Sequence, residues 1–199
     1  MSHSAVVIPI RSFGDGKSRL GARLDRAERA GLVRSMAENV VAAAGPMPVA
    51  VVSGAPEVRE WALALGLSVL DDPGSLDRAA AAGLAWAAAG GFGRVVIAHG
   101  DLPLATALSP LTIDRGRPVA VIVPCHRDDG TPVLSLPTAA DGFAFAYGPG
   151  SFRRHAAAAR AAGLAVRVRR DDRLGRDVDA PEDLVGLPGP ARLPAPLGA

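Results

Sequence analysis

The chain has 199 residues, 49% of them hydrophobic and 21% charged, with a formal net charge of +2. This length suits one domain with a buried core, and the composition is ordinary for a soluble globular protein. No apolar run approaches the roughly 18 residues that a membrane-spanning helix needs, and no basic segment precedes the first apolar run. We therefore expect a cytoplasmic protein without a membrane partner. The single cysteine, Cys125, excludes an intrachain disulfide framework.

Arginines raise the pI to 9.3 although the net charge is small. They are scattered, with local clusters at 11–29 and 167–176, and the aromatic residues that would stack on bases make up only 4% of the chain. This pattern argues against nucleic acid as a partner and favours a small phosphorylated ligand.

Short apolar runs alternate with helical patterns over residues 5–98. Asp25, followed three residues later by Glu28, is typical of a capping box at a helix start, and Gly45-Pro46 ends that helix. This alternation predicts an α/β fold with a mostly parallel sheet, flanked by helices and joined by right-handed crossovers. The predicted strands are 5–10, 49–53, 67–70 and 94–98, and the predicted helices are 25–45, 56–65 and 76–89.

The regular alternation of strand and helix patterns ends in the second half of the chain. There the patterns predict a short helical crossover at 104–111, strands at 119–123 and 131–136, an edge strand at 143–147, a helix at 152–162, a strand at 164–168 and a final short helix near 184. No linker divides the core, so we expect one domain over residues 1–187. Residues 188–199 contain four prolines and two glycines, which predicts a disordered tail.

Asp101 lies three positions after the predicted strand 94–98, with Pro103 two residues further on. In an open α/β sheet, ligands lie outside the carboxyl ends of the strands, so an acid placed there is a candidate site residue. The alternative is a turn aspartate that hydrogen-bonds its own backbone.

A glycine-rich loop with three basic residues follows the first predicted strand. Gly16-Lys17-Ser18 resembles part of a P-loop, but the glycine that this motif needs five positions earlier is replaced by Arg11. Backbone N–H groups together with Arg11, Lys17 and Arg19 are suited to a polyphosphate. The alternative is an ordinary basic surface loop.

Asp177 and Asp179 are two positions apart, so an extended backbone directs both carboxylates to one side. Mg²⁺ prefers carboxylate and phosphate oxygens and retains several waters, so acids from separate loops suffice to hold it. We expect Asp177 to be a ligand, whereas Asp179 is either a ligand or, like Glu182, a cap for the helix that begins near Pro181.

Two further turns carry hydroxyl groups, Gly130-Thr131 and the stretch from Gly148 to Ser151. The second lies at a predicted helix N-terminus, where anions bind well. His155, one turn into that helix, is either a phosphate contact or a surface residue, and His99 is interpreted as a residue that packs beside Asp101.

Taken together and in this order, these motifs resemble the guanylyltransferases of deazaflavin coenzyme F-420 biosynthesis, which act on 2-phospho-L-lactate or phosphoenolpyruvate. The resemblance runs from about Val6 to Leu187. Its motifs are Ile8-Pro9-Ile10, Lys17 to Leu20, Ala98 to Pro103, Asp129 to Leu134, Tyr147 to Phe152 with His155, and Asp177 to Leu184.

The resemblance implies a Rossmann-like nucleotidyltransferase fold of the glycosyltransferase-A type, Mg²⁺ as cofactor, and GTP and a small phosphorylated acid as substrates. It also implies that pyrophosphate leaves when an acceptor phosphate oxygen attacks the α-phosphorus of GTP. A homodimer is one alternative for the oligomeric state. The resemblance implies metal binding for Asp101 and Asp177, acceptor binding for Thr131, Gly148 and Ser151, and contact with the nucleotide phosphates for Lys17. Together with the residue patterns described above, it leads us to expect catalysis by Lys17 and Asp101, Asp179 as a third candidate metal ligand, and nucleotide binding by Arg11, Lys17, Arg19 and Asp77.

The chain departs from the family pattern at four places, one of which is the more glycine-rich stretch Gly14-Asp15-Gly16. Asp77 stands where an asparagine is usual in the nucleotide helix, which affects recognition of the base or ribose. Cys125-His126 replaces an Asp-Arg pair, and Pro132 replaces a common asparagine. A related nucleotidyltransferase with another base or acceptor, and a nucleotide-binding module without turnover, are the alternative functions.

Overall fold

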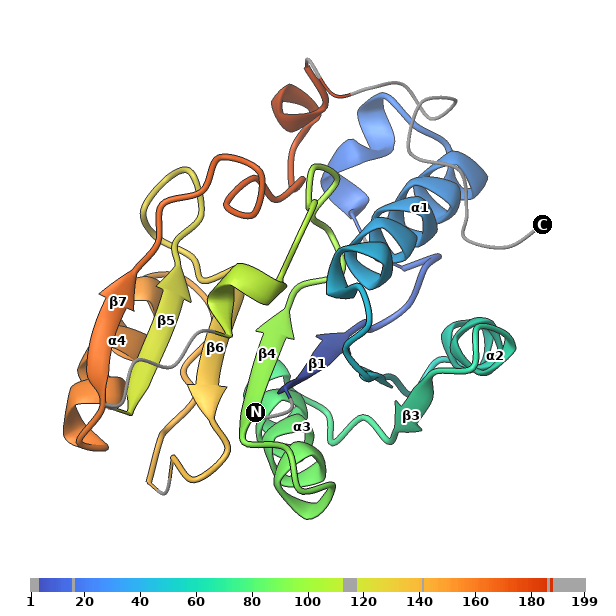
Figure 1. Ribbon diagram of the computed structural model, residues 1–199. Coiled ribbons are helices and arrows are strands. Elements are labelled where there is room, and N and C mark those ends of the chain that lie inside the picture. The colour runs from blue at the N-terminus through green and yellow to red at the C-terminus, as the bar shows by residue number, and fades with distance from the viewer. Residues whose placement is uncertain (1–3, 16, 113–117, 141, 186, 188–199) are drawn as a thin grey trace.

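The structure is a computed structural model that describes residues 4–15, 17–112, 118–140, 142–185 and 187. Within these residues the chain forms a seven-stranded sheet with helices on both faces (Figure 1). The strand order is β3-β2-β1-β4-β6-β5-β7. The strands are β1 Ser4–Pro9, β2 Val49–Val52, β3 Ser68–Leu70, β4 Arg94–Ala98, β5 Val119–Val123, β6 Val133–Pro137 and β7 Ala165–Val168. The predicted mostly parallel α/β sheet is confirmed.

Only β6 runs against its neighbours among these strands. It pairs antiparallel with both β4 and β5, whereas the other pairings are parallel. The loop after β5 turns the chain straight back, so β6 begins at the edge where β4 and β5 end: Val133 is paired with Ala98 and with Val123. The sheet thereby gathers the loop before β6 and the loop after β4 at one edge.

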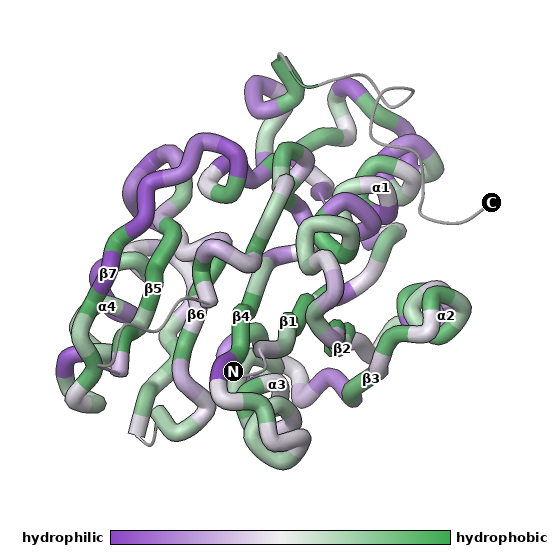
Figure 2. Tube along the Cα trace, viewed as in Figure 1, coloured by the Kyte–Doolittle hydropathy of each residue, from purple (hydrophilic) through white to green (hydrophobic). Residues whose placement is uncertain are grey.

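The helices cover the sheet in two layers. They are α1 Arg26–Ala44, α2 Pro56–Ala64, α3 Leu76–Ala89 and α4 Ser151–Ala161. Side chains of α1 and α2, including Met36 and Trp61, share one core with Val6 and Ile8, and side chains of α3 and α4 share a second core with Val7. Because alternate residues of a strand point to opposite faces, each buried strand contributes to both cores. Figure 2 shows β1, β4 and β5 as largely hydrophobic segments of the trace.

Local sequence signals explain two of the helices. The predicted capping box of α1 is confirmed, because the side chains of Asp25 and Glu28 each accept the other residue's backbone N–H at 2.8 Å. On α3, Gly83 permits close approach to β1, since a Cβ at this position would lie 2.4 Å from Cγ1 of Val7. The first feature therefore defines where α1 begins, and the second allows α3 to pack closely on the sheet.

The predicted helical crossover at 104–111 is wrong. The structure has only a short 3₁₀ helix there, η2 Ser109–Leu111. The side chain of Asn39 donates to the carbonyl oxygens of Leu102, Pro103 and Ala105 at 3.0 to 3.1 Å. These bonds from a distant helix hold the segment in an irregular conformation.

The predicted edge strand at 143–147 is also wrong. Side chains, instead of a neighbouring strand, use two of its backbone donors: Ala146 N–H donates to His155 at 3.0 Å and Tyr147 N–H donates to Asp77 at 2.6 Å. The rings of Phe143 and Tyr147 instead pack against the ring of His155, Tyr147 in an edge-on arrangement. The alternating aromatic residues therefore reflect ring packing.

The carboxyl ends of the parallel strands meet at the upper edge of the sheet in Figure 1. The 3₁₀ helix η1, Ser18–Ala22, lies there beside the 3₁₀ helix η3, Pro181–Leu184, so two segments that are far apart in the sequence lie side by side. No helix in the described residues is long and apolar enough to cross a membrane. The tail predicted for residues 188–199 lies outside the described residues.

Candidate active site

A cleft of about 790 Å³ lies at the carboxyl ends of β1 and β4. The residues that line it include parts of four distant segments: the loop after β1, the turn between β3 and α3, the loop after β4 and the segment before η3. Among the predicted site residues the cleft contains Arg11, Lys17, Arg19, Asp101 and Asp179. Its position agrees with the rule that ligands of open α/β sheets lie outside the carboxyl ends of the strands.

Lys17 lies at the centre of this group. Its ammonium donates to Asp101 Oδ2 and, at 2.8 Å, to Asp179 Oδ1. Its backbone is left-handed, with φ 58° and ψ 39°, directly before η1. A non-glycine residue in this region of φ/ψ space marks a position that the surrounding structure enforces. Lys17 is also the only lysine of the chain.

Burial and charge act in opposite directions on the pKa values of this pair. Burial by itself lowers the pKa of Lys17, but the charges and hydrogen bonds of Asp101 and Asp179 outweigh burial and raise it above its ordinary value. Burial would likewise raise the pKa of Asp101, but the neighbouring charges of Lys17 and His99 hold it below its usual range. Both groups are therefore charged at neutral pH.

Asp177 has the opposite tendency. Burial, followed by the negative charges of Asp101 and Asp179, raises the pKa of its carboxyl group. His126 Nδ1 lies 3.5 Å from Asp177 Oδ1. An additional cation near Asp177 would remove this electrostatic penalty.

Two buried carboxylate oxygens, Asp101 Oδ1 and Asp177 Oδ1, have no hydrogen-bond partner among the described residues. Buried acceptors without a partner are rare in folded proteins and are typical of positions that a ligand or ion completes. The described residues contain no group of three or more His, Cys, Asp or Glu side chains arranged to hold a metal ion. The described residues thus offer two hard oxygen atoms without hydrogen-bond partners but do not by themselves form a complete metal cage.

Asp183, which the sequence interpretation did not single out, holds the acidic segment in place. Its Oδ2 accepts the backbone N–H groups of Asp179 and Ala180 at 2.9 Å, and its Oδ1 accepts from Arg127 at 2.7 Å. Asp183, instead of Asp179 or Glu182, therefore caps η3. The sequence did contain a signal for this role: Asp183 lies three residues after Ala180, which is the spacing of a capping box.

The predicted acceptor residues form a second, buried cluster. Thr131 and Ser151 are each 1% exposed and His155 is fully buried. Neither hydroxyl lines the 790 Å³ cleft. His99 joins the two regions, since its backbone N–H donates to the carbonyl of Pro132 at 2.9 Å. Gly148 lies before α4 with φ +96°, a conformation that glycine adopts readily.

His155 neither reaches outward nor lies on the surface, so both alternatives expected for it are wrong. Burial lowers the pKa of its imidazole from 6.5 to about 4. Its ring packs against Tyr147 with ring centroids 4.6 Å apart. Helix α4 turns this residue inward, on the same face as the buried Ala156 and Ala159.

Asp77, predicted to bind the nucleotide, does not line the cleft. Its Oδ1 accepts the backbone N–H of Tyr147 at 2.6 Å, which fixes the segment before α4. The residues just before it, Asp72, Gly74 and Ser75, do line the cleft and were not singled out. The turn 71–75 between β3 and α3 was the available signal.

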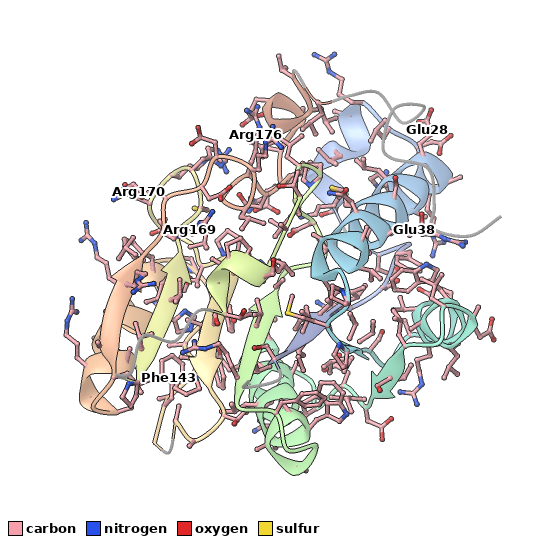
Figure 3. All side chains as sticks on the ribbon, viewed as in Figure 1. Glu28, Glu38, Phe143, Arg169, Arg170 and Arg176 are labelled. Carbon is pink, nitrogen blue, oxygen red and sulfur yellow. The ribbon has the colours of Figure 1, made fainter. Side chains whose placement is uncertain are left out.

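Three arginines of the second cluster have partners within the protein. Arg170 forms an ion pair with Asp128, and Arg169 forms one with Asp171 at 3.2 Å. Arg176 donates to the carbonyl of Val185 at 3.2 Å. Figure 3 shows these three arginines on the segment that follows β7.

Comparison with known proteins gives a consistent result. The family model described as guanylyl transferase CofC like matches residues 4–188. The chain is 40% identical to a phosphoenolpyruvate guanylyltransferase of Rubrobacter xylanophilus, over 91% of each chain. It is 34% identical to a 2-phospho-L-lactate guanylyltransferase of Methanothermobacter thermautotrophicus, over 91% of this chain and 82% of that protein.

Solved structures share the fold. A protein of Desulfovibrio desulfuricans, provisionally called a nucleotide-diphospho-sugar transferase, matches with a TM-score of 0.74 and 20% identity, over 90% of this chain and 84% of that chain. A nucleotidyl transferase from Methanothermobacter thermautotrophicus matches with a TM-score of 0.66 and 15% identity, over 92% and 94%. Fold, motifs and family model agree, and the chain belongs to the CofC-like guanylyltransferase family.

Proposed function

We propose that this protein transfers GMP from GTP to the phosphate of a three-carbon acid in coenzyme F-420 biosynthesis, and that pyrophosphate is released. Phosphoenolpyruvate is the first choice of acceptor, because the relatives with 34% to 40% identity include several named for that acid. 2-Phospho-L-lactate is the second choice. The observation that carries the proposal is the convergence of Lys17, Asp101 and Asp179 from three distant segments on one cleft.

Mg²⁺ fits the donor set. Asp101 Oδ1 and Asp177 Oδ1 are buried hard-oxygen ligands without hydrogen-bond partners in the described part of the chain, and Mg²⁺ needs only one or two carboxylates in addition to water and phosphate oxygens. Asp179 is the third candidate ligand, and it now pairs with Lys17. When bound, Mg²⁺ would neutralise negative charge on the nucleotide phosphates.

The reaction that we propose forms a bond between an acceptor phosphate oxygen and the α-phosphorus of GTP, and it breaks the bond from that phosphorus to the pyrophosphate oxygen. The acceptor phosphate is already anionic, so no general base is required. The main task of the protein is to bring two anions together and to stabilise the charge that develops. Lys17, Arg11 and Arg19 supply positive charge along the cleft, and Lys17 remains protonated because its pKa is raised.

We assign the acceptor to the loop with Thr131 and to the N-terminus of α4 with Gly148 and Ser151. These residues adjoin the Asp101 loop through the hydrogen bond from His99 N–H to Pro132. Hydroxyl groups and a helix N-terminus suit a carboxylate and a phosphate. The same contacts serve phosphoenolpyruvate, 2-phospho-L-lactate and a phosphoglycerate, since these acids share both anionic groups.

The substitution Asp101→Asn tests the metal assignment. The amide retains the shape of the side chain but not its charge, so Mg²⁺-dependent binding of a non-hydrolysable GTP analogue is expected to weaken at least about tenfold, and pyrophosphate release is expected to stop. Asp71→Asn is the matched control, because the side chain of Asp71 is 94% exposed and lies outside the cleft lining. Near-normal turnover of Asp101→Asn with Mg²⁺ would remove Asp101 from the metal site.

A further inference from the structure

A chain of hydrogen bonds links a backbone amide to the two hydroxyls assigned to the acceptor. Ala146 N lies 3.0 Å from His155 Nε2, and His155 Nδ1 lies 3.0 Å from Thr131 Oγ1. Thr131 Oγ1 lies 3.3 Å from Ser151 Oγ. All three side chains are at most 1% exposed.

The backbone amide determines the tautomer of His155. A backbone N–H is a donor only, so Nε2, which faces it, must be the acceptor. The ring proton then lies on Nδ1, and this N–H donates to Thr131 Oγ1. Burial lowers the pKa of His155 to about 4, so the ring remains neutral at physiological pH and retains this tautomer.

The tautomer decides how many donors the hydroxyl pair retains. Thr131 and Ser151 carry one hydroxyl proton each, and one of these protons forms the bond between them. With the proton on His155 Nδ1, Thr131 accepts from the ring and the second hydroxyl proton remains free, whichever hydroxyl donates to the other. In the other tautomer Nδ1 carries no proton and is an acceptor. Thr131 would then donate its hydroxyl proton to the ring and Ser151 would donate to Thr131, so neither hydroxyl proton would be left for a ligand.

We propose that His155 is a positioning residue that keeps one hydroxyl proton of the Thr131–Ser151 pair available for an anionic group of the acceptor. The inference rests on the proposed function, which places the acceptor at this pair. A carboxylate or phosphate oxygen only accepts hydrogen bonds, so a pair without a free proton would present lone pairs to it. His155 thus supports acceptor binding without contacting the acceptor.

Two substitutions separate the nitrogen atoms of the ring. His155→Asn retains a donor close to the position of Nδ1, whereas His155→Gln retains a polar group close to Nε2 and loses the donor to Thr131. We expect His155→Gln to raise KM for the acceptor acid about tenfold or more, with KM for GTP unchanged, and His155→Asn to restore most of that loss. Arg153→Gln, an exposed change on the same helix, is the matched control.

A double-mutant comparison tests whether His155 acts through the hydroxyl pair. In a Thr131→Val background, His155→Gln is expected to add no further increase in acceptor KM, because the ring has no hydroxyl left to orient. Additive effects, or equal increases in KM for GTP and acceptor, would indicate a purely structural role and overturn the proposal.

The wild-type protein provides a test that does not depend on the folding of a variant. The ¹⁵N chemical shifts of the His155 ring at neutral pH are expected to identify the Nδ1–H tautomer. An Nε2–H tautomer would overturn the proposal even if the enzyme is fully active. Absence of pyrophosphate release by the wild-type enzyme with GTP and every acid tested would instead overturn the proposed function, so the two failures are distinguishable.

Discussion

The buried His155 makes a quantitative prediction about stability and pH. Its pKa is about 4 in the folded protein and about 6.5 when exposed, so between these values the unfolded chain binds a proton that the folded chain does not. Stability must therefore rise with pH through this window. The contribution is fully present above pH 6.5 and is lost as the pH falls toward 4. The difference corresponds to about 2 to 3 kcal/mol between pH 7.5 and pH 4.5.

His155→Gln isolates this contribution, because every other titrating group remains in both proteins. Urea unfolding followed by circular dichroism at pH 7.5, 6.0 and 4.5 gives the free energy of unfolding of each protein. The wild type is expected to lose about 2 to 3 kcal/mol more than the variant between the two extremes. Parallel pH dependence of the two proteins would refute the burial of a neutral imidazole at this position.

Three further substitutions test other parts of the account. Lys17→Met leaves the acidic side chains of the cleft uncompensated, so the free energy of unfolding at pH 7 is expected to fall by about 1 to 3 kcal/mol, and Mg²⁺ is expected to raise Tm more in this variant than in the wild type. Asp183→Ala removes the acceptor of two backbone N–H groups and is expected to cost about 1 to 2 kcal/mol in urea unfolding. Gly83→Ala forces a Cβ against β1 and is expected to cost about 1 to 3 kcal/mol, whereas Gly31→Ala, with open space around it, is expected to stabilise α1 slightly.

Each of these three predictions can be contradicted by a specific result. A Lys17→Met protein with wild-type stability and no response to Mg²⁺ would contradict the electrostatic account of the cleft. An Asp183→Ala protein that unfolds at the wild-type urea concentration would show that the acidic segment is held by other contacts. Equal effects of the two glycine substitutions would contradict the close approach of α3 to β1.

Much of the fold could be predicted because its signals are local. The capping box at Asp25 and Glu28 and the glycine at 45 lie within a few residues of the helix ends that they define. The same reasoning located the site edge, because the carboxyl ends of parallel strands converge whatever their order in the sheet. Asp101 was found in this way.

The parts that were mispredicted depend on side chains far away in the sequence. Asn39 binds carbonyl groups 63 to 66 positions later, and these bonds replace the helix expected at 104–111. Asp77 and His155 similarly take the backbone donors of the segment 143–147. No periodicity within these segments reports such bonds, so a pattern of apolar residues alone gives the wrong element.

In the candidate site, too, local features could be predicted from the sequence and long-range contacts could not. The residue types and their strand-end positions could be predicted, but the pairing of Lys17 with acids 84 and 162 positions away could not. The burial of Thr131, Ser151 and His155 depends on how α4 packs against the sheet. The assigned roles of these residues stay predictions until the substitutions are measured.

The central claim is tested most directly by a matrix of GTP and ATP against phosphoenolpyruvate, 2-phospho-L-lactate and 3-phospho-D-glycerate, with Mg²⁺ present and pyrophosphate as the readout. Mass spectrometry of the same reactions identifies the product. We expect pyrophosphate with GTP and phosphoenolpyruvate, together with a product whose mass equals the acid plus GMP less one water. No pyrophosphate in any reaction that contains GTP would contradict the proposed function.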